Sequence, residues 1–145
     1  ANPDTDLFPS DAKAVQKPSN DAYGEAEQYR VLAYSRVPQS LVQMKGCLAA
    51  GFPFTVGFSV YESLYDADGE PKAHVPLPGG DDGLLGGHAV LAVGYDDHTQ
   101  AFKLRNSWGV KAQEKGYFYL PYSYLTNSDL ADDFWTIRLV DAPDA

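Results

Sequence analysis

Two short segments constrain this chain more than any other part of its sequence. Gly86–Tyr95 places His88 at the start of an apolar run, and Leu104–Gly109 places Asn106 at the end of a second one. Turn-forming residues at Asp96–Gln100 separate the two runs, which predicts a hairpin of antiparallel strands. His88 and Asn106 then lie at the same end of neighbouring strands, whose backbones are roughly 4.8 Å apart.

An amide beside an imidazole is suited to orienting a base. The side-chain oxygen of Asn106 can accept a hydrogen bond from a ring nitrogen of His88, which fixes the tautomer without adding charge. Trp108 can shield that bond from water and so strengthen it. Taken singly, each residue has a simpler explanation: a strand-end histidine bonded to a backbone carbonyl, a turn asparagine and a core tryptophan. Their joint spacing favours a base with its orienting partner.

Three motifs together resemble those of the papain-like cysteine peptidases: Gly-His-Ala-Val at residues 87–90, Asn-Ser-Trp-Gly at 106–109 and Gly-Tyr at 116–117. The resemblance extends over residues 38–120 and more weakly into the flanks. It implies the second lobe of that fold, an α+β architecture in which an antiparallel sheet curls into an open β-barrel with one or two short helices.

The resemblance also implies roles for individual residues. His88 corresponds to the catalytic histidine, Asn106 to the catalytic-site asparagine that orients it, and Trp108 to the supporting residue that shields the pair. The positions that flank the histidine line the family's substrate cleft, which here are Gly86, Gly87 and Ala89.

The chain departs from the family's pattern at the nucleophile. The Gly-Ser-Cys-Trp type of segment that carries the family's cysteine has no match, nor has the glutamine that precedes it. Val110–Glu114 stands where the family often has a second Trp-Gly. The one cysteine, Cys47, is predicted on the apolar face of a helix near its C-terminal end, where a thiolate is disfavoured. We therefore expect Cys47 to be inert.

We expect one domain over residues 21–145, preceded by an extended arm at residues 1–20 that is rich in Pro, Asp, Asn and Ser. A short helix is predicted at 21–28. The best helix is predicted at 40–50, where Ser40-Leu41-Val42-Gln43 fits a capping box and Gly51 suits the C-terminal cap.

Apolar and alternating runs predict six strands, at residues 29–37, 54–60, 89–95, 101–105, 117–120 and 134–140. The strand at 89–95 is apolar on both faces, which is typical of a central strand. Asp66–Gly87 is dense in Gly, Pro and Asp and is predicted to be a long loop.

Charge and composition limit the partners. Twenty acidic residues against eleven basic ones give a formal charge of −9, which argues against nucleic acid and anionic membranes. A single cysteine excludes an internal disulfide bond. Turn chemistry explains the aspartates at 96–97 more simply than a metal site does. A solvated loop explains those at 81–82 better than weak calcium binding, so we expect no metal site and no cofactor.

These observations predict part of a cysteine-type peptidase that supplies the histidine and the asparagine but not the nucleophile, so that the chain is inactive alone. The predicted partners are a peptide or protein substrate and a cysteine-bearing first lobe, from the same precursor or from another chain. The other predicted partner is a second copy of this chain, in a homodimer that forms through exposed apolar surface or through exchange of the arm at residues 1–20. The alternative is a papain-like binding or scaffold module without catalysis. The sequence assigns no compartment.

Overall fold

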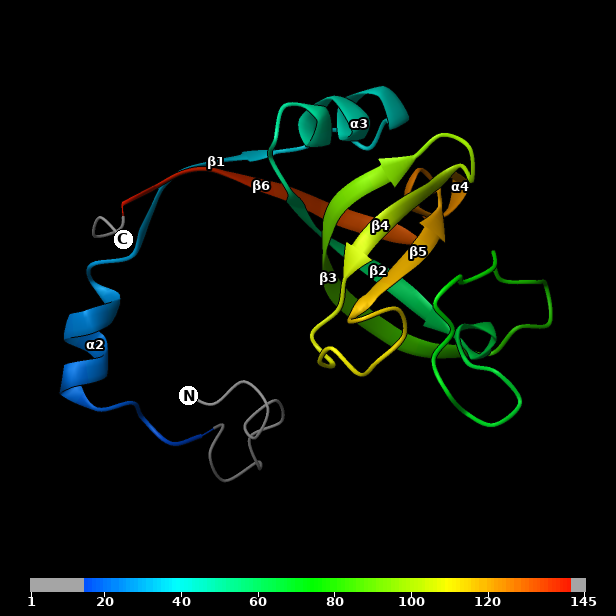
Figure 1. Cartoon of the computed structure of the whole chain (residues 1–145), viewed down its shortest axis with the longest axis horizontal. Coiled ribbons are helices and arrows are strands. Elements are labelled where there is room, and N and C mark those ends of the chain that lie inside the picture. The colour runs from blue at the N-terminus through cyan, green and yellow to red at the C-terminus, as the bar shows by residue number, and fades with distance from the viewer. Residues whose placement is uncertain (1–14, 142–145) are drawn as a thin grey trace.

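The structure is a computed structural model that describes residues 15–141. Its centre is a six-stranded sheet with the strand order β1-β6-β2-β3-β4-β5, in which every neighbouring pair is antiparallel. Figure 1 shows β2 to β5 and the start of β6 curling together, while the sheet stays open. The predicted α+β fold with an open, barrel-like sheet is confirmed.

The six predicted strands are all present as β1 (Arg30–Arg36), β2 (Phe54–Tyr61), β3 (Leu84–Asp96), β4 (Ala101–Arg105), β5 (Tyr117–Pro121) and β6 (Ala131–Asp141). The helices are α2 (Asn20–Ala26), α3 (Leu41–Ala49) and α4 (Tyr122–Leu125), and a 3-10 turn, η1 (Glu62–Leu64), follows β2. The sequence did not indicate α4, because four residues are too few to show a helical period.

The core lies inside the curl. Along β2 the buried positions alternate with more exposed ones, and Phe54 and Phe58 are among the buried side chains. Their rings pack against those of Phe102 on β4 and Phe118 on β5, with centroid distances of 6.2 and 5.8 Å. A strand with this period-two pattern fixes which residues face the core, and therefore its register.

β6 belongs to two parts of the structure. Its residues 131–136 pair with β2 in the barrel, and its residues 135–141 pair with β1. The β1–β6 pair therefore continues outwards as a two-stranded ribbon that leads to α2 (Figure 1). Large apolar side chains on this ribbon are exposed: Val31, Leu32, Tyr34, Ile137 and Leu139.

Helix α3 packs its predicted face, with Met44 and Cys47 buried, and Gly51 follows it with a φ of 84°. The capping box at its start is wrong in one respect. Ser40 occupies the N-cap position, but its side chain makes no capping hydrogen bond. The first turn is closed by the backbone, where the Met44 N–H donates to the Ser40 carbonyl at 2.9 Å, and burial of the apolar face stabilises the helix.

Two other predicted boundaries are corrected. The loop predicted at Asp66–Gly87 ends earlier, because β3 begins at Leu84 and its first residues pair with the end of β2. Most of the predicted arm at residues 1–20 lies outside the described residues. Of the remainder, residues 15–19 are exposed and irregular, and Asn20 begins α2.

Strand β3 is central, with β2 on one side and β4 on the other. Only one of its apolar faces is buried: Val90 and Ala92 lie in the core, while Ala89 on the opposite face is exposed. Within residues 15–141, no helix is long and apolar enough to cross a membrane.

Candidate active site

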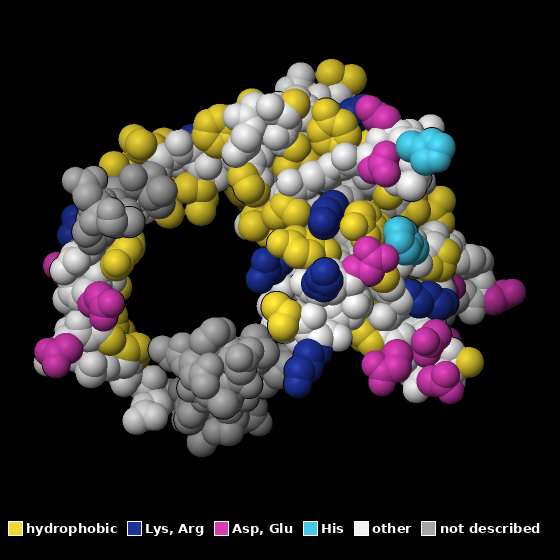
Figure 2. All heavy atoms as spheres, in the orientation of Figure 1, with side chains coloured by type: hydrophobic (Ala, Val, Ile, Leu, Met, Phe, Trp, Pro, Cys, Tyr) yellow, Lys and Arg dark blue, Asp and Glu magenta, His cyan; other side chains and the backbone are white. Residues whose placement is uncertain are grey.

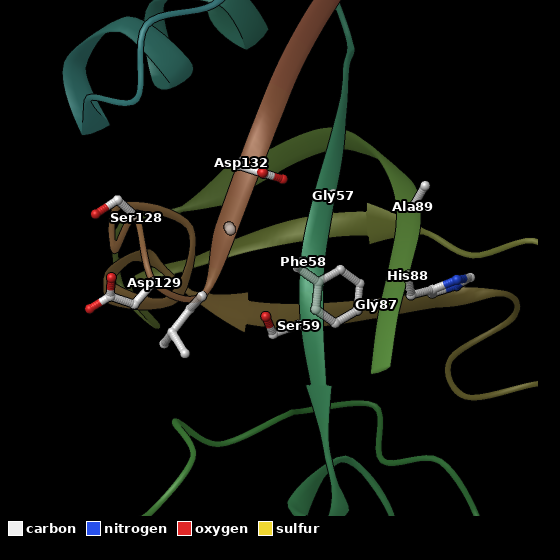
Figure 3. A pocket seen from close by; sticks show the side chains of 11 residues that line it. Gly57, Phe58, Ser59, Gly87, His88, Ala89, Ser128, Asp129 and Asp132 are labelled. Carbon is white, nitrogen blue, oxygen red and sulfur yellow. The ribbon is translucent and has the colours of Figure 1, made fainter. Parts of the chain in front are cut away.

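His88 lies on the inward face of β3, at the mouth of the curled sheet. It shares this face with Val90 and Ala92, and it pairs across the ladder with Phe58 of β2. The two rings meet edge to face with their centroids 5.8 Å apart. Figure 3 shows both side chains projecting from these neighbouring strands. The imidazole is half-buried, so one part of it is held by the core and another part stays accessible.

A β-bulge puts Asn106 on the same face as His88. Next to the turn, Tyr95 pairs with Phe102, and continuation of that register would place Asn106 opposite Leu91, on the outer face. The register shifts between Ala92 and Gly94, so that Leu91 pairs with Arg105 instead. Asn106 follows opposite Val90, and a shift of one residue in register exchanges the two faces of a strand.

The side chains of His88 and Asn106 are hydrogen-bonded, as predicted. Nε2 of His88 lies 3.0 Å from Oδ1 of Asn106, and the asparagine is buried. The backbone N–H of Ser107 donates to the same oxygen at 2.8 Å. A backbone N–H can only donate, so the Asn106 amide atom that lies beside Ser107 and His88 must be the oxygen. Nε2 therefore carries the hydrogen, and the lone pair of His88 is on Nδ1, the atom from which it can act as a base.

Trp108 covers the ring of His88. The two rings are stacked, with centroids 5.2 Å apart and planes 22° from parallel, and the indole also packs against the core. Trp108 lies in the loop between β4 and β5, which closes where Gly116 faces Gly109. A Cβ on Gly116 would lie 3.1 Å from the Gly109 carbonyl oxygen, and its φ is 85°, so this position requires glycine.

The three predicted cleft positions line two pockets that His88 also lines. Gly87 and Ala89 line a pocket of about 430 Å³ together with His88, Phe58 and the segment 128–132 (Figure 3). Gly86 and Gly87 line a smaller pocket of about 200 Å³ on the side of Trp108. An added Cβ on Gly86 would meet nothing within 4 Å, so the glycines leave open space beside the ring. Contact of these positions with a substrate stays a prediction.

Comparisons with known proteins agree with this geometry. The family model described as "Papain family cysteine protease" matches residues 7–134. The chain belongs to the papain family of cysteine proteases. It is 36% identical to an uncharacterized peptidase C1-like protein of Acanthamoeba polyphaga mimivirus over 135 residues, and this match covers 88% of the chain.

Two solved structures of cysteine proteases have the same fold as this chain. Xylellain, a cysteine protease from Xylella fastidiosa, superposes with a TM-score of 0.83 and 50% identity over 90% of this chain. The clostridial cysteine protease Cwp84 superposes with a TM-score of 0.66 at 23% identity over 92% of the chain, which shows a common fold. The chain spans only part of these relatives: 43% of the viral protein, 48% of xylellain and 34% of Cwp84.

Cys47 is not part of this papain-family site. Its sulfur lies 3.3 Å from the Phe52 carbonyl oxygen and 3.7 Å from a guanidinium nitrogen of Arg138, and the residue is buried. Helix α3, which carries it, precedes the end of β2 where Phe54 pairs with Ala92. The Phe58–His88 pair lies four residues further along the ladder, which is roughly 13 Å from the Phe54–Ala92 pair at the usual rise per residue.

Gln113 is a residue of the site that the sequence analysis missed. Its side chain bonds that of Asn106, with Nδ2 of the asparagine 2.9 Å from Oε1 of the glutamine. The segment Val110–Glu114 differs from the family's usual pattern, and this difference was the only available signal.

Two other titratable side chains make contacts outside this site. The carboxylate of Asp96 accepts from the backbone of His98, as turn chemistry predicts. His74 stacks on Tyr119 with the ring centroids 4.7 Å apart and lies 3.3 Å from a carboxylate oxygen of Glu114. Over the described part of the chain, no group of three or more His, Cys, Asp or Glu side chains could hold a metal ion.

Proposed function

We propose that this chain supplies the base of a cysteine peptidase whose nucleophilic thiol comes from a first lobe outside these 145 residues. The observation that carries the proposal is the bond between His88 Nε2 and Asn106 Oδ1, which leaves Nδ1 as the basic atom. Among the described residues, Nδ1 has no hydrogen-bond partner. A thiol placed beside it could therefore give up its proton to the ring.

In this proposal His88 acts twice. As a base it takes the thiol proton, and the thiolate then attacks the peptide carbonyl carbon. As an acid the imidazolium gives the proton to the leaving amine. The amine departs, and the acyl-enzyme that remains is then hydrolysed by water. Asn106 keeps accepting from Nε2 throughout, so the ring holds one orientation while its charge changes.

The chain alone is proposed to be inactive. Cys47 is buried in α3 and contacts Phe52 and Arg138 rather than the imidazole. The donors that would stabilise an oxyanion stand next to the cysteine in the family's pattern and have no match here. Xylellain, of which the chain covers 48%, is a cysteine protease, and this supports the same activity for a complete protein.

Exposed apolar side chains mark surfaces that a first lobe could cover. Leu84 and Leu85, at the start of β3 beside the candidate cleft, are 63% and 55% exposed. The β1–β6 ribbon exposes a second apolar group, and Figure 2 shows hydrophobic side chains along it. Groups of exposed apolar side chains often mark an association site. We propose the cysteine-bearing lobe as the partner.

A peptidyl epoxide that alkylates activated cysteines tests the proposal. The 145-residue chain should show no adduct at Cys47 and no peptide turnover. The assembled protein that contains this chain and a cysteine-bearing lobe should show one adduct, on the cysteine of that lobe, and His88→Ala should slow its formation. An adduct on Cys47 of the isolated chain would contradict the proposal. If the protein is a binding or scaffold module, neither the isolated chain nor the assembled protein should show an adduct. If the isolated chain forms a homodimer, sedimentation should give twice the mass of one chain.

A further inference from the structure

A continuous line of side-chain hydrogen bonds connects the candidate base to the loop that precedes β3. Gln113 Nε2 donates to the Lys72 carbonyl oxygen at 2.9 Å. Gln113 Oε1 accepts from Asn106 Nδ2 at 2.9 Å. Asn106 Oδ1 in turn accepts from His88 Nε2 at 3.0 Å. Two side-chain amides thus lie between a backbone carbonyl and the imidazole.

Backbone groups fix the direction of this line at both amides. The Lys72 carbonyl can only accept, so the nitrogen end of the Gln113 amide must face it and the oxygen end must face Asn106. The Ser107 N–H can only donate, so the oxygen of Asn106 must face Ser107 and His88. If either amide were rotated by 180°, two donors or two acceptors would meet.

The acceptor at the far end is itself held in place. The Lys72 backbone N–H donates to the Leu64 carbonyl at 2.9 Å, and its ammonium donates to the Ser63 carbonyl at 3.0 Å. Gln113 has a φ of 50°, in the left-handed region that a residue with a Cβ rarely adopts. Loop closure alone would favour Gly or Asn at this position, and neither could bridge from Lys72 to Asn106.

We propose that Gln113 is a positioning residue that, through Asn106, holds His88 in the tautomer with hydrogen on Nε2. The role of this tautomer in catalysis rests on the proposed function, but its population is a property of the chain itself. Without Gln113, the Ser107 N–H would hold the Asn106 oxygen toward the ring through one hydrogen bond. Gln113, anchored on Lys72, adds a second bond that holds the nitrogen end of the Asn106 amide away from His88.

Nuclear magnetic resonance of the ¹⁵N-histidine-labelled chain measures the tautomer directly. In the wild type the His88 nitrogens should show Nε2 protonated and Nδ1 unprotonated. Gln113→Asn keeps an amide and suits the left-handed backbone, but it is one methylene too short to bridge. It should raise the population with hydrogen on Nδ1 by about fivefold, the change expected when one hydrogen bond of about 1 kcal/mol is lost.

Gln113→Glu is the matched variant. Its carboxylate still accepts from Asn106 Nδ2, but it loses the donor to the Lys72 carbonyl and sets a second acceptor near that oxygen. Because the bond to Asn106 is kept, the tautomer should stay closer to the wild type than in Gln113→Asn. Gln113→Gly relieves the positive φ and serves as the test if Gln113→Asn does not fold. A wild-type tautomer in a folded Gln113→Asn or Gln113→Gly chain would overturn the proposal, and so would a Gln113→Glu chain that behaves like Gln113→Asn.

Kinetic measurements on the assembled two-lobe protein distinguish failure of this inference from failure of the proposed function. Gln113→Asn should lower kcat for peptide hydrolysis with little change in KM, and Gln113→Glu should recover most of the loss. If the tautomer shifts in the chain but kcat does not change, the positioning role holds and the role of His88 as base fails. If the tautomer does not shift, the positioning role fails irrespective of activity.

Discussion

Asn106 holds the imidazole of His88 from the neighbouring strand, with 3.0 Å between Oδ1 and Nε2. The bond forms because the bulge in β3 turns both residues to the same face of the sheet. Trp108 stacks over the imidazole at 5.2 Å and covers one side of it. The ring is therefore held by contacts from two directions. Among the described residues, Nδ1 is the ring nitrogen that makes no hydrogen bond.

Removal of the asparagine amide should weaken catalysis without abolishing it. Asn106→Ala deletes one neutral hydrogen bond to the ring, so kcat/KM of the assembled two-lobe protein should fall by about tenfold, equivalent to about 1.4 kcal/mol. Peptide hydrolysis measured with a fluorogenic substrate checks this. Asn20→Ala, which makes the same change on α2, should have no effect. An Asn106→Ala protein as active as the wild type would mean that the bond does not orient the base.

The indole of Trp108 should protect the bond between His88 and Asn106 from water. In Trp108→Ala the hydrogen on Nε2 should exchange with solvent faster than in the wild type, and Trp108→Phe should fall between the two because a smaller ring still stacks. Proton exchange at the imidazole, followed by nuclear magnetic resonance, measures this. Since Trp108 is only partly buried, the stability loss should stay below the roughly 3–5 kcal/mol of a fully buried ring. Equal exchange rates would exclude shielding.

Tyr124 should make the fold sensitive to alkali. Its buried hydroxyl donates to the Ser59 carbonyl at 2.7 Å, and burial raises its pKa to about 12. In the unfolded chain the same hydroxyl ionises near the ordinary tyrosine pKa of 10.0, so the unfolded state gains stability as the pH rises from there towards 12.

Tyr124→Phe should therefore lower the free energy of unfolding by about 1 kcal/mol at neutral pH and reduce its fall above pH 10. Urea unfolding at a series of pH values measures both effects. Tyr34→Phe removes the same atom from an exposed ring and serves as the control. A Tyr124→Phe chain that loses stability in alkali as steeply as the wild type would show that another group is responsible.

Asp97 should make the fold sensitive to acid. Hydrogen bonds from the Lys45 ammonium and, at 2.9 Å, from the Tyr122 hydroxyl lower the pKa of this carboxyl below 3.8. The contribution of Asp97 is therefore present above pH 3.8 and is lost as the pH falls through the lowered value. The urea midpoints of the wild type and Asp97→Asn should differ at neutral pH and converge in acid. Asp68→Asn, in the exposed loop, should match the wild type throughout, and a constant Asp97→Asn difference would contradict this origin.

The hairpin and the pairing of His88 with Asn106 could be predicted because their signals are local. The turn at Asp96–Gln100 and the apolar runs on either side fix which strands are neighbours. The bulge was not predicted, because Gly94 was its one local signal and a glycine within a strand also marks a close approach of another backbone. The sequence thus indicated that the two residues lie at one end of the hairpin, and tertiary packing decided that they share a face.

The role of Gln113 was missed for a different reason. Its two partners, Lys72 and Asn106, are 41 and 7 residues away, and contacts of that kind depend on how the loops close. The capping box at Ser40 was an error of the opposite sort, because a local motif was present but its hydrogen bond did not form. Local patterns therefore predicted the strands and the contact between His88 and Asn106, and the loop contacts that support this pair required the structure.

Peptide hydrolysis by a His88→Ala variant of the assembled two-lobe protein tests the central claim most directly. Positioned acid–base catalysis contributes about 10²- to 10⁴-fold, so kcat/KM should fall by that factor. His98→Ala, at the exposed turn between β3 and β4, is the matched control and should retain full activity. Hydrolysis that survives the loss of His88, or that falls equally in both variants, would contradict the assignment of the base to His88.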